Sequence, residues 1–272
     1  FRHRSNGSRN EVTMVREFEK ESSVANHFIA ELRDVDVQKD PMRFRRNLER
    51  IGEVMALELS RTLEYEEQEV TTPLGIARTK LMVEQPVLAT ILRAGLPLHQ
   101  GMLNYFDRAD SAFVSAYRKH NKGEDTFEVE VEYLSSPTLQ DRVVVLCDPM
   151  LASGRSMVLV YKALLRLGKP KSFHVAAAIA SAEGMAYVKQ HMPPGTRFWI
   201  GAIDEEMTAQ AYIVPGLGDA GDLGTDAAEV LLLTADGDLV ADLRALAADF
   251  ALLGHDWRLL KRRILYRGNG LV

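Results

Sequence analysis

Residues 143–156, VVVLCDPMLASGRS, carry the clearest indication of the fold. The first five of them form an apolar run typical of a buried strand, and a helical pattern follows the loop and continues to Leu167. Between strand and helix lie an acid, Asp148, and a short loop of small residues that contains Gly154. Parallel sheets are built from units of this kind. We therefore expect an α/β fold with a mostly parallel central sheet flanked by helices.

The same alternation of strand and helix continues on both sides of this stretch. Residues 40–63 are predicted to form a helix with Asp40 as N-cap, Pro41 at the first helical position and one apolar stripe. A further short helix is expected around residues 185–189. Further strands are predicted at residues 87–92, 111–117, 173–180 and 197–203.

Other segments do not follow this alternation. Residues 118–136 alternate and are charged, which predicts a β-hairpin that projects from the body. The acidic run EYEEQE, residues 64–69, is interpreted as a solvated helix end. Residues 1–10 are predicted to be a disordered or tag-like tail, and residues 225–272 a C-terminal extension of unknown role. The domain itself is expected to span residues 11–224.

The composition excludes several classes of function. A net charge of −5 over 272 residues argues against a nucleic-acid or anionic-membrane partner. The single cysteine, Cys147, excludes an internal disulfide, and the seven histidines lack metal-binding spacing. There is no apolar run long enough to span a membrane and no apolar signal-peptide core at the start. We expect a cytoplasmic protein.

The loop after Cys147 has the features of a phosphate site. Residues 152–156 can turn consecutive backbone N–H groups toward an anion at a helix N-terminus, and Ser153 and Ser156 can add hydroxyl donors. Asp148 can accept hydrogen bonds from sugar hydroxyls. The alternative is a strand–turn–helix connection in which the acid and the serines only cap the helix.

This loop, DPMLASGRS, resembles the loop that binds phosphoribosyl diphosphate (PRPP) in uracil phosphoribosyltransferases, a family of type I phosphoribosyltransferases. The usual form is DPMLATG followed by a small residue and serine. Ser153 keeps the hydroxyl of the usual threonine, whereas Arg155 adds charge and bulk that can alter the affinity for PRPP. The resemblance implies that PRPP is bound here by Asp148, Pro149, Met150, Leu151, Ala152, Ser153, Gly154, Arg155 and Ser156.

Two further segments resemble the same family in the same order. ILRAGLP, residues 91–97, is similar to its pyrophosphate loop, in which Arg93 would bind the diphosphate. AYR, residues 116–118, is similar to the segment that supplies a second arginine, Arg118. A surface salt bridge is the alternative role for each arginine. Both follow predicted strands, where parallel sheets bind ligands, and this favours the functional role.

The segment YIVPGLGDAGD, residues 212–222, formally contains GxGxxG. A dinucleotide loop needs a helix after the glycines, and Asp222 and Gly224 stand where it would begin. Nearly the same string closes over the pyrimidine in uracil phosphoribosyltransferases. The resemblance implies that uracil is bound by Ile213, Gly218, Asp219 and Ala220, with Asp219 also reaching a PRPP hydroxyl or sensing the N1 proton.

The resemblance extends from about residue 11 to 222 and implies the reaction of uracil with PRPP to give UMP and pyrophosphate, in pyrimidine salvage. It implies Arg93, Asp148 and Asp219 as catalytic residues, Mg²⁺ held mainly by PRPP without a dedicated protein site, and a homo-oligomer. Arg155 and the C-terminal residues leave open a non-catalytic regulator that binds PRPP or UMP. A purine enzyme is disfavoured, because such enzymes usually carry two adjacent acids where Pro149 follows Asp148.

Overall fold

The computed structural model describes residues 13–120, 127–220 and 223. The predicted N-terminal tail, the hairpin tip and the C-terminal extension lie outside these residues. The proposed division of the chain at residues 10 and 224 therefore stays a prediction.

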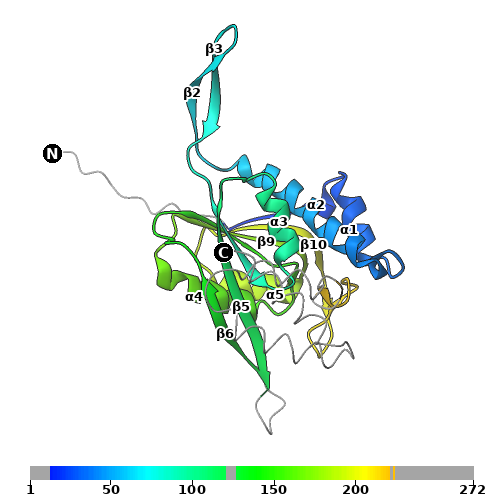
Figure 1. The fold of residues 1–272 in the computed structure, drawn as a ribbon. Coiled ribbons are helices and arrows are strands. Elements are labelled where there is room, and N and C mark those ends of the chain that lie inside the picture. The colour runs from blue at the N-terminus through cyan, green and yellow to red at the C-terminus, as the bar shows by residue number, and fades with distance from the viewer. Residues whose placement is uncertain (1–12, 121–126, 221–222, 224–272) are drawn as a thin grey trace, which may run out of the picture. The chain divides into compact units, whose positions relative to one another are not determined.

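Within the described residues, eight strands form one sheet in the order β1-β10-β9-β7-β4-β5-β6, with β8 paired to β9 (Figure 1). Neighbouring strands are parallel throughout, except that β6 runs antiparallel to β5. This confirms the predicted sheet, and each strand predicted from the sequence is present. The strands are β1 (Met14–Glu17), β4 (Val87–Leu92), β5 (Asp110–His120), β6 (Phe127–Ser135), β7 (Val143–Cys147), β8 (Met150–Leu151), β9 (Ser172–Ser181) and β10 (Arg197–Asp204).

Helices cover both faces of this sheet. Side chains of α1, α2 and α3 pack on one face, and side chains of α4 and α5 pack on the other. The helices are α1 (Ala25–Arg33), α2 (Pro41–Ser60), α3 (Leu96–Leu103), α4 (Arg155–Leu164) and α5 (Ala182–His191), with 3-10 turns η1 (Phe18–Lys20), η2 (Val37–Lys39) and η3 (Leu165–Leu167).

Helix α2 forms as the sequence predicts. The Asp40 carboxylate accepts hydrogen bonds from the N–H groups of Met42 (3.0 Å) and Arg43 (3.2 Å), and Pro41 takes the first helical position. All five residues of the predicted apolar stripe are buried: Phe44, Leu48, Ile51, Met55 and Leu59. The stripe faces the sheet because the 3.6-residue period places these side chains on one side of the helix.

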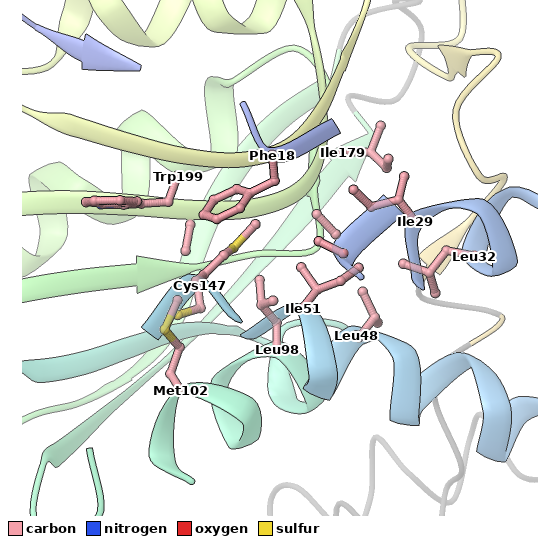
Figure 2. Close-up of a cluster of buried hydrophobic side chains, with 14 of the residues drawn as sticks. Phe18, Ile29, Leu32, Leu48, Ile51, Leu98, Met102, Cys147, Ile179 and Trp199 are labelled. Carbon is pink, nitrogen blue, oxygen red and sulfur yellow. The ribbon is translucent and has the colours of Figure 1, made fainter. Parts of the chain in front are cut away.

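Figure 2 shows the core between α1, α2, α3 and the sheet. Ile29 and Leu32 of α1 and Leu48 and Ile51 of α2 lie in the same cluster as Cys147 of β7. The thiol of Cys147 is free and fully buried, and burial raises its pKa. A buried neutral thiol of this kind is a packing residue, as expected from its apolar strand.

The acidic run 64–69 does not continue a helix, and this prediction was wrong. Helix α2 ends at Ser60, and the run enters β2 (Tyr65–Thr72), which pairs antiparallel with β3 (Gly75–Met82) in a separate two-stranded sheet. The register places Glu67 opposite Lys80 and Glu69 opposite Arg78, with 3.1 Å between the charged groups of the second pair. Opposite charges across the two strands make the acidic sequence compatible with a strand, and local sequence does not reveal this pairing.

The predicted hairpin at 118–136 is confirmed as an antiparallel pair of strands, but the pairing begins five residues earlier in the chain than predicted. Strands β5 and β6 already pair from Phe113 opposite Ser135, so the hairpin grows out of the edge of the main sheet. β5 continues past residue 115, the last that pairs with β4.

Among the described residues, no helix has the length and apolar character needed to cross a membrane.

Candidate active site

The predicted site loops all follow strands that lie side by side in the sheet. β10, β9, β7, β4 and β5 are consecutive and parallel, so their carboxyl ends share one edge. The predicted base-site segment, residues 212–220, comes after β10, and the predicted PRPP loop, residues 148–156, comes after β7. Arg93 follows β4, and Arg118 lies near the end of β5. The fold therefore brings segments that are far apart in sequence to a single edge, where parallel sheets bind ligands.

The loop at 148–154 is held against β9 by backbone hydrogen bonds. The N–H of Asp148 donates to the carbonyl of Ala176 (3.0 Å), and the N–H of Ile179 donates to the carbonyl of Pro149 (3.0 Å). Strand β8 then pairs Met150 with Ile179 and Leu151 with Ala180. The loop is thus an extension of the sheet, and its shape is set by the strand beside it.

Ser181 fixes the far side of this loop. Its buried hydroxyl donates to the carbonyl of Ala152 (2.6 Å) and accepts from the N–H of Gly184 (2.8 Å), which caps α5. A Cβ on Gly184 would stand 2.0 Å from the Ala152 carbonyl oxygen. The close approach of loop and helix therefore depends on glycine at 184 and on a hydroxyl at 181.

Gly154 makes the turn from the loop into α4. Its φ of +72° lies in the left-handed region, and a Cβ there would stand 2.7 Å from Cγ1 of Val188 and 3.0 Å from the Gly184 carbonyl oxygen. In the part of the chain that the structure describes, no side chain caps this helix. Its first N–H groups can therefore serve an anionic ligand. Ser153 and Ser156 are half-buried beside them, and Arg155 is exposed.

Asp148 has an altered affinity for protons. Burial raises the pKa of its carboxyl to about 7, against a smaller lowering by the Met150 N–H, which donates to it at 3.3 Å. The side chain keeps some exposed surface at the edge of the sheet, so the carboxyl is enclosed by protein but within reach of a ligand. A carboxyl group in this position can accept hydrogen bonds from sugar hydroxyls once it is ionised.

The loop after β4 lies directly against the end of β7. Gly95 is buried, and a Cβ there would stand 2.2 Å from the hydroxyl of Thr90 and 3.0 Å from the carbonyl oxygen of Cys147. The Thr90 hydroxyl itself donates to that carbonyl (3.3 Å). This packing brings the loop of Arg93 next to the strand that carries Asp148. The Leu92–Arg93 peptide bond is cis, and Arg93 is exposed.

Arg118 lies in β5, opposite Val129 of β6. Its side chain lies outside the part of the chain that the structure describes. Its position on the strand agrees with the predicted site edge, and its contact with PRPP stays a prediction.

The segment 212–220 has buried anchors and exposed peptides. Ile213 and Ala220 are buried in the core cluster beside α1, whereas Gly218 and Asp219 are exposed. The strand before the glycines is β12 (Ile213–Val214), two residues long and antiparallel to β11 (Glu206–Met207). A dinucleotide loop follows a strand of the parallel sheet, so this geometry disfavours the dinucleotide interpretation.

Sequence reasoning missed four residues that shape these loops. The Thr90 hydroxyl packs against Gly95 of the loop after β4, and the Ser181 hydroxyl donates to Ala152 of the loop after β7. In the segment 212–220, Arg33 donates to the carbonyl of Gly216 and Asp204 accepts from its N–H. Asp204 carries a signal that was available, since an acid at the end of a strand is the feature that drew attention to Asp148. The others are ordinary residues whose partners are brought near only by folding.

Known proteins match this chain over the same region. A family model described as "Uracil phosphoribosyltransferase" matches residues 20–223. A uracil phosphoribosyltransferase of Porphyromonas gingivalis is 53% identical over 203 residues, which make up 75% of this chain and 94% of the relative. One from Thermococcus gammatolerans is 36% identical over 207 residues, 75% of this chain and 89% of the relative. The solved structure of the AQ2163 protein from Aquifex aeolicus matches with a TM-score of 0.68 and 29% identity, over 77% of this chain and 97% of that chain.

Proposed function

The chain belongs to the uracil phosphoribosyltransferase family, and we propose that the edge of its sheet joins uracil to the ribose of PRPP, releasing pyrophosphate and forming UMP. The observation that carries this proposal is the placement of the site loops at the ends of neighbouring strands. One loop presents helix N–H groups, one presents an arginine, and one presents the backbone of a glycine-rich turn. These suit a phosphate, a diphosphate and a flat base, respectively.

The residues of the loops divide the work of the reaction. The bond between C1 of the ribose and the diphosphate breaks as the bond from C1 to N1 of uracil forms. Negative charge grows on the leaving diphosphate, and Arg93 and Arg118 neutralise it. The N–H groups and hydroxyls at 153–156 hold the 5-phosphate, and Asp148 accepts hydrogen bonds from the ribose hydroxyls. The reaction needs no covalent intermediate with the protein. Much of the rate acceleration therefore comes from holding uracil and PRPP in the orientation in which they react.

The base is selected by the turn at 213–220. The exposed backbone of Gly218 can approach uracil closely and match its alternating carbonyl and N–H groups. Ile213 and Ala220, which are buried in the core cluster, support the turn from its inner side and are assigned to the base site with it. We assign Asp219 either to the N1 proton, which uracil loses as the bond to C1 forms, or to a hydrogen bond donated by a PRPP hydroxyl.

We propose that Mg²⁺ enters the site together with PRPP. Among the residues that the structure describes, no group of three or more acidic, histidine or cysteine side chains can hold a metal ion. Asp148 adds one carboxylate near the phosphate loop. Mg²⁺ bound with PRPP would neutralise further negative charge on the leaving diphosphate.

We infer a homo-oligomer from the β2–β3 hairpin. All but one residue of each strand is exposed, and a lone two-stranded hairpin is marginally stable in water. One face of the hairpin carries Val70, Ala77 and Leu81 with a single charged residue, Glu66. The same face also carries the uncharged polar residues Gln68, Thr72 and Thr79. We assign this face to a second copy of the chain, because covering the exposed side chains of Val70 and Leu81 would stabilise the hairpin. The predicted place in pyrimidine salvage follows from the use of free uracil, and the cytoplasmic location stays a prediction.

The test is an assay of UMP and pyrophosphate formation by the full chain from PRPP, Mg²⁺ and uracil, with cytosine, hypoxanthine and orotate in parallel. We expect turnover with uracil alone and loss of turnover in Arg93→Ala. Saturable binding of PRPP or UMP without turnover would support the regulatory alternative instead, and turnover with hypoxanthine would contradict the assignment of the base turn.

A further inference from the structure

We propose that Arg33 and Asp204 are positioning residues that hold the turn at 213–220 in the shape that binds the base. This inference rests on the proposed function of that turn. The two residues are 171 positions apart in the sequence and come from the ends of α1 and β10.

Arg33 and Asp204 together hydrogen-bond to both the N–H and the carbonyl of Gly216. The two carboxylate oxygens of Asp204 accept from the two terminal nitrogens of Arg33, each at 2.8 Å. Oδ2 of Asp204 also accepts from the N–H of Gly216 (2.9 Å), and Nη1 of Arg33 donates to the carbonyl of Gly216 (3.1 Å). Glu19 stands 3.8 Å from Nη2 of Arg33. Three of these hydrogen bonds close a ring through Gly216, and the fourth completes the bidentate pair of Arg33 and Asp204. Together they fix the orientation of the Gly216 peptide groups.

The turn as it is folded has no room for a side chain at position 216. Gly216 has a φ of +57°, and a Cβ there would stand 2.2 Å from the carbonyl oxygen of Ile213. Leu217 is buried with Ile29 and Leu32 of α1, which Figure 2 shows inside the core. The turn is therefore fixed on its inner side by apolar packing and at Gly216 by the charged pair.

This arrangement determines where the exposed residues of the turn lie. Gly218 and Asp219 lie two and three positions after Gly216, and neither is buried. A change in the orientation of Gly216 displaces their peptide groups relative to the base. The PRPP loop is attached to β9 and α5, so it is not displaced by the same change.

Burying the charges of Arg33 and Asp204 carries a desolvation free energy that an apolar contact at the same place would avoid. The Asp204 side chain is 7% exposed and that of Arg33 18%, and Nε of Arg33 is buried without a hydrogen-bond partner among the described residues. Burying two charges in this way is seldom the most stable solution, and apolar replacements of such pairs are often neutral or stabilising. A role in fixing the turn accounts for the use of charges here.

The experiment compares Arg33→Lys and the double variant Arg33→Met with Asp204→Leu in the full chain. Lysine keeps the charge but lacks the planar fork that meets both carboxylate oxygens of Asp204 and the Gly216 carbonyl together. The double variant removes both charges and leaves neither of them buried without a partner, while Gly216 loses both of its hydrogen-bond partners. The matched control is Arg43→Lys, because Arg43 makes a bidentate pair with Glu31 of the same helix α1 (2.7 Å and 2.7 Å) that does not reach the turn.

We expect both variants to raise KM for uracil, by at least roughly tenfold, since small displacements of a binding group have effects of this size. KM for PRPP is expected to rise several-fold less than KM for uracil, because Asp219 is the one residue of the turn that is also assigned to PRPP. The control is expected to change neither KM. Parallel changes for uracil and PRPP, an equal effect of Arg43→Lys, or no change in KM for uracil would each overturn the proposal. Absence of UMP formation by the unaltered chain would instead contradict the proposed function.

Discussion

At the scale of single residues, the burial of Asp148, a proposed PRPP-binding residue, is expected to lower the stability of the folded chain at neutral pH. Its pKa in the folded chain is about 7, above the ordinary value of 3.8, because burial penalises the charged form. The folded state therefore holds the proton more tightly than the unfolded chain. The stability linked to this proton is present below about pH 4 and is lost as the pH rises from about 4 to 7.

We predict that Asp148→Asn raises the melting temperature relative to the unaltered chain by an amount that increases between pH 4 and pH 7, since asparagine has no charge to bury. The same variant should lower kcat/KM for PRPP at pH 8. Melting curves followed by circular dichroism at several pH values measure the first effect. Asp107→Asn, at an exposed position, is the control, and a gain in stability that does not vary with pH would contradict the assigned pKa.

Arg93 is predicted to act through the planar fork of its guanidinium. Arg93→Lys keeps the positive charge but replaces two directed donors by a point charge. We expect kcat/KM for PRPP to fall roughly 10- to 100-fold, the cost of losing about one hydrogen bond to a charged group. Steady-state kinetics with the exposed Arg108→Lys as control provide the test, and equal effects of the two variants would show that Arg93 has no special place.

At the scale of elements, the position of the predicted PRPP loop, residues 148–156, depends on helix α5, which carries none of the predicted ligand-binding residues. Ser181 joins the loop to the start of α5 through Ala152 and Gly184. We predict that Ser181→Ala leaves these two backbone groups unpaired, destabilises the chain by about 1–3 kcal/mol and raises KM for PRPP more than KM for uracil.

Thr196→Ala is the matched control for this prediction. Thr196 is also buried and donates to a backbone carbonyl, that of Pro193 at 2.8 Å, away from the site loops. Chemical denaturation and kinetics of both variants separate stability from binding. If Thr196→Ala raises KM for PRPP as much as Ser181→Ala does, the serine acts only through global stability.

At the scale of the whole molecule, the β2–β3 hairpin is predicted to pair two copies of the chain. Val70 lies on its sparsely charged face and Thr71 on the opposite face, which carries Glu69 and Arg78. We expect Val70→Glu to lower the mass measured by light scattering toward that of one chain, and Thr71→Glu to leave it unchanged. Equal masses for the two variants would refute this use of the hairpin.

A second prediction at this scale concerns residues 225–272. The family match ends at residue 223, and a relative is covered over 94% of its length by 203 residues of this chain. We therefore expect a chain ending at Gly224 to keep kcat and both KM values within about twofold. Assay of the shortened chain measures this, and a loss of UMP formation with retained folding would assign the last residues a part in the site.

The sequence by itself determined the parallel sheet and the positions of its loops. Periodicity, a proline after an N-cap, and an acid followed by small residues act within a few positions of one another, and VVVLCDPMLASGRS contains a strand, loop and helix start in that range. The local pattern also indicated a phosphate loop and a role for Asp148 toward sugar hydroxyls, whereas the proposed roles of Arg93 and of the turn at 213–220 came from the resemblance to a family.

Only the tertiary structure decided which distant residues hold these loops. The acidic run 64–69 became a strand because Lys80 and Arg78 lie opposite it, and Arg33 meets Asp204 across 171 positions. Such contacts depend on the register of strands and on how helices pack against the sheet. These are properties of the folded chain as a whole, because the free energy that selects them comes from burial and pairing between segments remote in sequence.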